Sequence, residues 1–506
     1  MARNEVKWGA ILSYLLIIIN SVYGLVITPY IVASVGDVEF GVYKSISSLS
    51  TSLMVLDLGL GGMVMRYIAK YRAEQNKEKI NELISMALGE GSLLMALVVA
   101  VCSVVYFLIP HMYAKGFSDE QVRLAQQLFL IMACNLVLHI VENVQNGIIT
   151  GHNRFALGNG LKLARIILRI VLIYALLYAF ESSLILAMVD LALTVLLIVA
   201  EYIYIRWGLH TPIRISFRGW DRSLFGESFK YTMLLFLTSI AAQINNNLDN
   251  VIIGAVMGAG FVTVYSMGLL IFGMFEHLST AISGVMLPTV TNILNEEDGM
   301  TKVQRTIVQA GRVQFLLLGA ALVGFAVIGK NFIQLWLGDG YEDVYAITLI
   351  LMVPALFELC VNVCLAVLRA KNMLEFRTGV LFATTSLNAV VTIVGVRLFG
   401  YFAAAVGTAL SFVIGSLIIM NVYYYKKLSF RMLRMYREIL RGTWLCLILA
   451  GGAVYASSRW LFTTTSWISF LANVAVFGAV YGVTMLLFGL NKQEKRAIPI
   501  FKKLWR

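Results

Sequence analysis

The sequence predicts an all-α, polytopic membrane protein with about fourteen transmembrane helices. Hydrophobic residues make up 59% of the 506 residues and charged residues only 13%, whereas soluble domains carry about 25% charged residues. Apolar runs long enough to cross a bilayer, about 20 residues, recur along the whole chain. The basic residues, which give a net charge of +12, lie between those runs and indicate membrane topology rather than nucleic-acid binding.

The expected spans are joined by short connections. The first follows Arg3 and Lys7 and is longer than the core of a cleavable signal peptide, which has about 7–15 residues. No run has the alternating pattern of a β-barrel strand. The spans are expected at 8–33, 41–66, 83–109, 122–150, 158–180, 183–206, 229–257, 261–290, 312–336, 344–368, 378–398, 401–424, 443–462 and 467–490.

Lysine and arginine mark one side of the membrane. Of the 40 such residues, 34 fall in the two tails and in alternate loops. Because loops rich in these residues remain inside, both termini are expected in the cytoplasm, in a multi-pass protein of the cytoplasmic membrane. Contact with anionic membrane lipids is the ordinary consequence.

An internal repeat divides the chain. Gly36 recurs as Gly258 at an offset of 222, and Asn153 recurs as Asn372 at an offset of 219. Six helices is an even number, so two six-helix bundles would be related by a pseudo-two-fold axis along the membrane normal, as in alternating-access transporters. The expected domains are an N-terminal bundle at 1–210, a C-terminal bundle at 211–427, and a segment at 428–506 with an interfacial stretch, helices 13 and 14 and a basic cytoplasmic tail.

Two stretches are expected to lie at the membrane surface as anchors. The segment 428–441 has a basic stripe, and the tail 497–506 is similar. Such stripes bind the interface when the opposite face is apolar. The apolar face of the first stretch, expected to face lipid, comprises Met432, Met435, Tyr436 and Ile439.

Ionisable groups inside a membrane are costly and mark cavities or partners. On the fourth span, one helical face carries His139, Glu142, Asn143 and Asn146. The fifth span begins nearby with Arg165 and Arg169, a pair suited to bidentate phosphate binding. The alternative is that both arginines reach the inner interface or pair with Glu142; Glu142 could also be a resting partner that a phosphate displaces.

The second span contains Asp57 and ends at Arg66. Glycines follow Asp57 and allow either close helix approach or local unwinding. Asp57 lies at membrane depth and is a candidate site residue. Arg66 is also interpretable as an anchor at the cytoplasmic end.

The seventh span has six polar residues within eight positions: Gln243, Asn245, Asn246, Asn247, Asp249 and Asn250. At membrane depth each polar group needs a hydrogen-bond partner. The carboxylate and amide oxygens could hold Na⁺, or Asp249 could take up a proton. A sugar-binding wall and an interhelical hydrogen-bond network remain alternatives.

Glu276 and Glu358 lie in the middle of later spans, the second of them one turn after Pro354. Proton coupling and structural hydrogen bonding are both open for these two. Asp190, Glu201 and Arg397 are further candidates.

Sequence signatures of enzymes are missing. There is no phosphate-binding G-x-x-x-x-G-K-[ST] loop, nucleophile elbow or zinc motif. The chain is therefore expected to be a transporter without a cofactor or a metal site, apart from Na⁺ or H⁺ as a coupling ion.

The first 70 residues resemble a known family. The pattern Asn20-x-x-Tyr23, Thr28-Pro29-Tyr30, Phe40-Gly41-x-Tyr43, Leu56-Asp57-Leu58-Gly59 and Arg66-Tyr67 is similar to the start of bacterial polysaccharide-biosynthesis membrane proteins. These are the oligosaccharide-lipid flippases of the multidrug/oligosaccharidyl-lipid/polysaccharide exporter superfamily.

The resemblance implies translocation of undecaprenyl-diphosphate-linked oligosaccharide from the inner to the outer leaflet, driven by an ion gradient. Arg66 matches the motif directly, whereas Arg165 and Arg169 match cavity cations only in type and location. The implied partners are the lipid-linked oligosaccharide and a polysaccharide polymerase, and a monomer is expected. A multidrug or metabolite antiporter and a membrane glycan polymerase or ligase are the alternative functions.

Overall fold

The computed structural model describes residues 2–57, 59–209, 243, 247–284, 286–463 and 466–491. Every regular element in this part of the chain is a helix, which confirms the all-α membrane class. Twelve described helices are long and apolar enough to cross a membrane, or thirteen if α17 and α18 form one bent span. The predicted count of fourteen stays a prediction, because the start of the seventh span lies outside the described residues.

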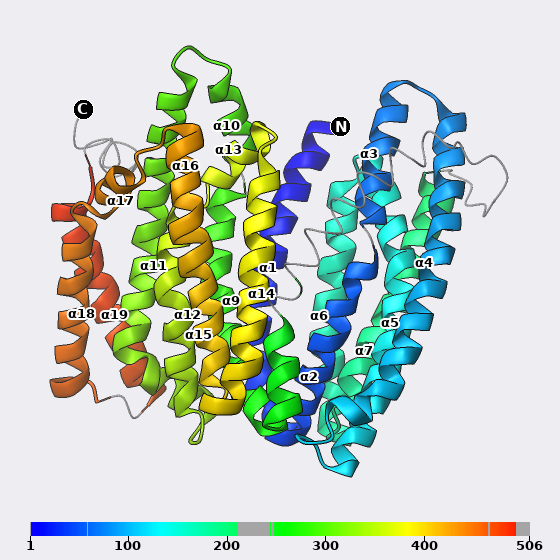
Figure 1. Cartoon of the computed structure of the whole chain (residues 1–506), viewed down its shortest axis with the longest axis horizontal. Helices are drawn as coiled ribbons and strands as arrows, with labels where there is room; N and C mark the ends of the chain where they lie inside the picture. The colour runs from blue at the N-terminus through cyan, green and yellow to red at the C-terminus, as the bar shows by residue number, and fades with distance from the viewer. Residues whose placement is uncertain are drawn as a thin grey trace. The chain divides into compact units, whose positions relative to one another are not determined.

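Two compact units are formed by residues 1–266 with 389–401, and by 267–388 with 402–506. The first unit contains the helices coloured from blue to teal in Figure 1 and one further short helix. They are α1 (Ala2–Val35), α2 (Asp37–Leu53), η1 (Met54–Asp57), α3 (Leu60–Ala73), α4 (Lys77–Met112), α5 (Asp119–Gly151), α6 (Phe155–Phe180), α7 (Leu184–Ile203), η2 (Tyr204–Gly208) and the short helix Asn247–Val256.

The remaining helices belong wholly or partly to the second unit. They are α9 (Ala259–Ser283), α10 (Met286–Leu294), α11 (Gly299–Leu337), α12 (Glu342–Cys360), α13 (Cys364–Ala370), α14 (Leu374–Phe399), α15 (Phe402–Ser411), η3 (Phe412–Met420), α16 (Asn421–Leu428), α17 (Met432–Leu440), α18 (Thr443–Trp460), α19 (Trp467–Thr484) and η4 (Met485–Gly489). The predicted domain boundaries at 210 and 427 rest on the sequence repeat and stay a prediction.

The second predicted span is broken rather than continuous. It consists of α2, the 3₁₀ turn η1 and α3, and Gly59 before α3 has a left-handed φ of 71°. Glycine adopts this conformation without the steric cost that a Cβ imposes. Of the two roles expected for these glycines, local unwinding occurs at Gly59. Close approach occurs at Gly61, where a Cβ would come within 2.5 Å of the Asn143 carbonyl oxygen on α5.

Local geometry repeats at the offsets found in the sequence. Helix α14 begins and ends 219 residues after α6, at 374 against 155 and at 399 against 180. Asn153 and Asn372 both have positive φ, as do Gly36 and Gly258. These matches support the duplication, whereas the symmetry axis stays a prediction.

The amphipathic helix α17 does not turn its apolar face to lipid as predicted. Met432, Met435 and Ile439 are at most 5% exposed, and Ile439 packs against Gly311 of α11. The apolar side of the predicted stripe is therefore covered by protein, and Ile439 contacts α11 there.

A buried arginine fixes this arrangement. Arg312 of α11, 2% exposed, donates to the carbonyls of Glu438, Arg441 and Gly489 at 3.0, 2.9 and 2.8 Å. Helix C-termini expose carbonyls without intrahelical partners, and the guanidinium satisfies several of them at once. The sequence places Arg312 among the inner basic residues but does not predict this role. The predicted surface tail at 497–506 lies outside the described residues.

Candidate functional site

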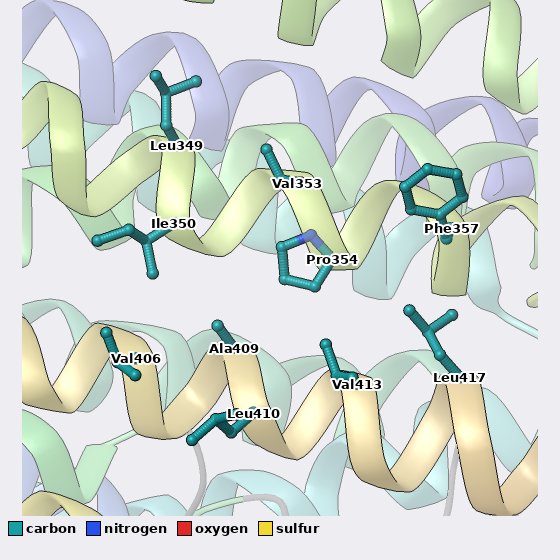
Figure 2. Close-up of a pocket in the computed structure, with 10 residues that line it drawn as sticks. All are labelled: Leu349, Ile350, Val353, Pro354, Phe357, Val406, Ala409, Leu410, Val413 and Leu417. Atoms are coloured by element: carbon teal, nitrogen blue, oxygen red, sulfur yellow. The ribbon is translucent and has the colours of Figure 1, made fainter.

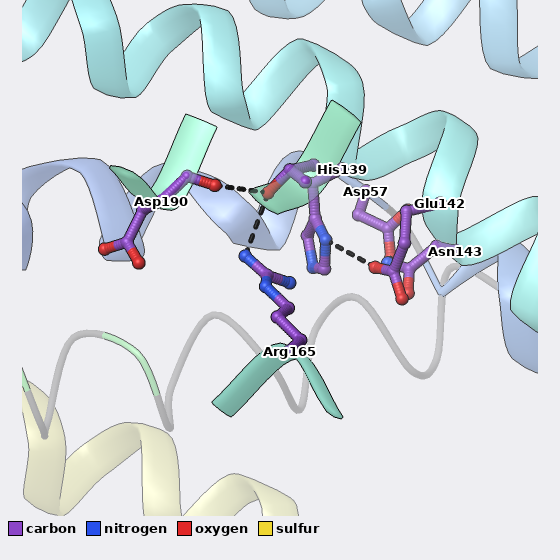
Figure 3. Close-up of polar contacts among 7 residues, drawn as sticks. Asp57, His139, Glu142, Asn143, Arg165 and Asp190 are labelled. Carbon is purple, nitrogen blue, oxygen red and sulfur yellow. Dashed lines mark hydrogen bonds and ion pairs between the residues drawn. The ribbon is translucent and has the colours of Figure 1, made fainter. Parts of the chain in front are cut away.

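A polar cavity of about 240 Å³ lies within the first unit. Its walls are α2, α5, α6 and α7, and it contains two residues of the predicted site, His139 and Arg165. Figure 3 shows the Arg165 guanidinium and the His139 ring directed toward the same region. The other polar groups that line the cavity are Tyr43, Ser47, Ser50, Thr51, Asn135, Asp190 and Thr194.

Arg165 has donors to spare. Its Nη2 donates to Thr194 Oγ1 at 2.9 Å, and the Thr194 hydroxyl donates to the Asp190 carbonyl at 2.9 Å. A guanidinium has five N–H donors. Among the described residues, the Arg165 side chain donates one hydrogen bond, to Thr194. This half-buried cation can therefore donate to an incoming anion without losing an ion pair.

Arg169 is held differently from Arg165. Its Nε and Nη2 lie 2.6 and 2.9 Å from the two carboxylate oxygens of Asp190, and its guanidinium lies 5.1 Å from the centre of the Tyr23 ring. The resting partner of this arginine is thus Asp190 on α7, and the alternative that Arg169 pairs with Glu142 is wrong. A bidentate carboxylate satisfies the same planar fork that a phosphate would use.

Glu142 is paired within its own helix. It is 3% exposed, and its Oε2 lies 2.8 Å from His139 Nδ1. One residue further, Asn143 donates to Asp57 Oδ2 at 2.8 Å. His139, Glu142 and Asn143 of the predicted polar face thus all make polar contacts. The close packing at Gly61 brings Asp57 against this face (Figure 3).

The other two candidates of this group lie elsewhere. Asn146 lies beside Glu201 of α7, a glutamate that is completely buried. Arg66 is exposed on α3 and does not line the polar cavity.

Sequence reasoning missed the hydroxyl wall on α2. Ser47, Ser50 and Thr51 line the cavity and lie at i, i+3 and i+4, one helical face. The signal is visible in the run SISSLSTS at 45–52, because six hydroxyls in eight residues are unusual for a lipid-facing helix.

The seventh span supplies a second polar centre in the first unit. Asp249 is 3% exposed; its Oδ2 accepts from the Tyr265 hydroxyl at 2.7 Å and its Oδ1 from the Thr392 hydroxyl at 3.1 Å. Next to it, the Asn250 amide donates to Ser48 at 2.9 Å. The structure therefore joins Asp249 and Asn250 to several hydroxyl groups. The other two ion-site candidates, Asn245 and Asn246, lie outside the described residues.

Glu276 and Glu358 come together in the second unit. They belong to α9 and α12, and their carboxyl groups are close enough to interact electrostatically. The Ser416 hydroxyl is a hydrogen-bond partner of Glu358. The two acids that the sequence singles out separately thus lie in the same region of the second unit.

The fold is that of polytopic helical transporters. The chain is similar to the lipid II flippase MurJ in an inward closed conformation, with a TM-score of 0.71 and 15% identity over 98% of this chain and 99% of that one. It is also similar to an inward-facing multidrug resistance MATE transporter of the MOP superfamily, with a TM-score of 0.55 and 15% identity over 83% and 99%. Likenesses at this identity concern the fold alone.

Residues 6–294 match the family described as polysaccharide biosynthesis protein, and the chain belongs to this family. The match covers more than half of the chain and confirms the resemblance seen in the first 70 residues.

Three curated relatives align with parts of the chain. The probable flippase AglR of Haloferax volcanii is 28% identical over 211 residues, 41% of this chain and 44% of that protein. The putative O-antigen transporter of Salmonella typhi is 21% identical over 63% and 72%. The lipopolysaccharide biosynthesis protein WzxC of Escherichia coli K12 is 22% identical over 43% of each chain. The alignments thus span less than half of AglR and of WzxC.

Proposed function

We propose that this protein is a flippase that moves undecaprenyl-diphosphate-linked oligosaccharide from the inner to the outer leaflet of the cytoplasmic membrane by alternating access. Its family and the names of its relatives support the transport of polysaccharide precursors. The single observation that carries the proposal is the polar cavity with Arg165, whose guanidinium keeps donors for a phosphate. Both termini would lie in the cytoplasm, and a polysaccharide polymerase would receive the product.

The size of the cavity limits what it could hold. Pockets for drug-sized ligands have about 300–1,000 Å³, so 240 Å³ suits a phosphate with part of one sugar. The hydroxyls of Ser47, Ser50 and Thr51 offer partners to a sugar, and Arg165 offers charge-assisted hydrogen bonds to a phosphate. The rest of the glycan and the lipid tail would stay outside this cavity.

We assign coupling to Asp249. A buried carboxyl between the Tyr265 and Thr392 hydroxyls has oxygen neighbours that suit either a bound Na⁺ or an exchanging proton. Hard cations prefer such oxygen ligands. Glu276 and Glu358 would be additional acidic groups that respond to the same gradient.

The alternative functions fit these groups less well. An antiporter for cationic drugs needs an unpaired carboxylate in its cavity, whereas Asp190 is already neutralised by Arg169. A glycan polymerase or ligase needs a sizeable outer loop, but the connections at 113–118, 181–183 and 338–341 are short.

Proteoliposomes would test the substrate. We expect the wild-type protein to flip a short undecaprenyl-diphosphate oligosaccharide and to leave the same glycan on a neutral lipid in its leaflet. Arg165→Ala with Arg169→Ala should abolish transport, because the phosphate loses its cations. The control is Arg305→Gln, an exposed arginine on α11. Equal rates for the charged and neutral lipids would contradict the proposal.

The driving ion is tested with Asp249→Asn, which keeps the shape of the side chain and removes its charge. Imposed Na⁺ or H⁺ gradients should accelerate wild-type transport several-fold and leave the variant at its basal rate. A variant that still responds fully to the gradient would exclude Asp249 as the coupling group.

A further inference from the structure

A second, basic pocket lies in the second unit, apart from the polar cavity. It has a volume of about 870 Å³ and lies where α17 meets the start of α18. Its basic groups are Arg434, Arg437 and Arg441, and its apolar groups include Leu433 and Trp444. The combination of guanidinium groups and exposed apolar side chains is typical of a membrane surface that binds charged head groups.

Two of the three arginines keep their charge available. Arg434 Nε lies 2.9 Å from Glu438 Oε1 and is therefore paired. Arg437 and Arg441 are exposed, and within the described part of the chain no carboxylate lies within ion-pair distance of either side chain. Helix α18 begins at Thr443, two residues after Arg441, and its N-cap Gly442 provides no side-chain cap. The positive end of a helix dipole thus adds to the charge of this pocket.

The second unit also has an apolar groove. The groove has a volume of about 610 Å³ and is lined only by apolar side chains of α12, α15 and η3; Figure 2 shows α12 running alongside the helical segment that carries the other lining residues. Phe357 and Leu417 lie at one end of it.

Tyr436 connects the two spaces. It lines the basic pocket, and its hydroxyl donates to the carbonyl of Phe357 at 3.3 Å and accepts from the Asn421 amide at 3.3 Å. Phe357 belongs to the α12 wall of the groove, and Asn421 directly follows η3, which carries Leu417 on the opposite wall. The tyrosine therefore holds the pocket next to that end of the groove.

We propose that this composite site binds one anionic phospholipid, with its phosphate against Arg437 and Arg441 and an acyl chain past Tyr436 in the groove. A free phosphate would use the arginines but not the apolar groove. A zwitterionic phospholipid also has a phosphate, but its choline cation would lie close to the two exposed guanidinium groups and would oppose binding. The proposal does not depend on the transported substrate.

Bromine quenching of Trp444 fluorescence would test the site. The full-length protein is reconstituted in phosphatidylcholine vesicles that contain increasing fractions of brominated phosphatidylglycerol. The signal of Trp444 is the difference between the wild type and Trp444→Phe. We expect saturable quenching at low lipid fraction, and none beyond the random level with brominated phosphatidylcholine.

The variant Arg437→Gln/Arg441→Gln should weaken this quenching about 30-fold in lipid fraction, because each basic side chain at an anionic surface contributes about 1 kcal/mol. The fold should persist, since Arg312 contacts the carbonyl of Arg441 and not its side chain. The matched control is Arg305→Gln/Arg369→Gln, which removes two exposed charges elsewhere in the unit and should leave quenching unchanged.

Three results would overturn the proposal. These are equal quenching by the neutral brominated lipid, unchanged quenching in the double variant, and displacement of the brominated lipid by millimolar inorganic phosphate. Preferential displacement by undecaprenyl diphosphate at equal fraction would assign the site to the substrate instead. A second variant, Val413→Phe, fills the groove without adding a tryptophan and should weaken binding while all charges remain.

Discussion

Helices α6 and α14 occupy equivalent positions in the repeat but carry different chemistry. Both have 26 residues, and α14 begins 219 positions after α6. At that offset Arg165 and Arg169 correspond to Thr384 and Asn388, and Asp190 corresponds to Ala409. In the second copy a neutral hydrogen bond is present at one of these positions, since Asn388 donates to Thr408 at 3.1 Å. The comparison teaches that the two copies share a helical frame, and that the arginines of the proposed anion site belong to the first copy and have uncharged residues at the equivalent positions of the second.

The largest effect should come from removing the spare cation. Arg165→Gln should lower the rate of lipid-linked oligosaccharide transport at least tenfold, because a charge-assisted hydrogen bond to phosphate is lost. The equivalent change in the second copy, Thr384→Val, should leave the rate within about twofold. Transport in proteoliposomes gives both rates, and a similar loss in the two variants would break the comparison.

The ion pair of the first copy should affect the stability of the fold. Asp190→Asn leaves the Arg169 guanidinium without its carboxylate; for a pair only about a quarter exposed, we expect a loss of about 2–3 kcal/mol in stability. Adding Arg169→Gln should restore most of it, because neither partner is then left alone. Thermal unfolding of the two variants measures the difference. An equally unstable double variant would show that the pair does not act as a unit.

The packing of α3 on α5 should give the smallest effect. Gly61→Ala places a Cβ against the Asn143 carbonyl and should cost about 1–3 kcal/mol by overpacking. The neighbouring Gly62→Ala meets nothing within 4 Å and should be neutral or slightly stabilising. Comparable melting temperatures for the two variants would mean that this contact does not hold Asp57 in place.

The sequence predicts the helices well and the partners of polar residues poorly. Apolar runs and loop charges locate the described spans because the bilayer demands them. Spacing along one helix also finds the face that carries His139 and Glu142. It cannot tell that Asp190 rather than Glu142 holds Arg169, since the choice depends on how α6 and α7 pack. The hydroxyl wall of α2 is visible in the sequence, but serines on helices often bond only their own backbone.

The apolar side of α17 illustrates the same limit. Its amphipathic pattern is equally compatible with lipid and with a protein surface, and only the position of α11 decides between them. The role of Arg312 cannot be predicted for a related reason. Its partners are backbone carbonyl groups, which every residue has, so the sequence does not show which of them the arginine contacts.

The clasp formed by Arg312 has a mechanical consequence. Sliding α11 against α17 or η4 would strip one guanidinium of several carbonyl partners together, and hydrogen bonds to charged groups contribute about 1.5–3 kcal/mol each. We therefore expect α11, α17 and η4 to move together as one rigid unit in a conformational change. Bending is expected instead at positions such as Gly59, where the span is already interrupted by an unwound turn.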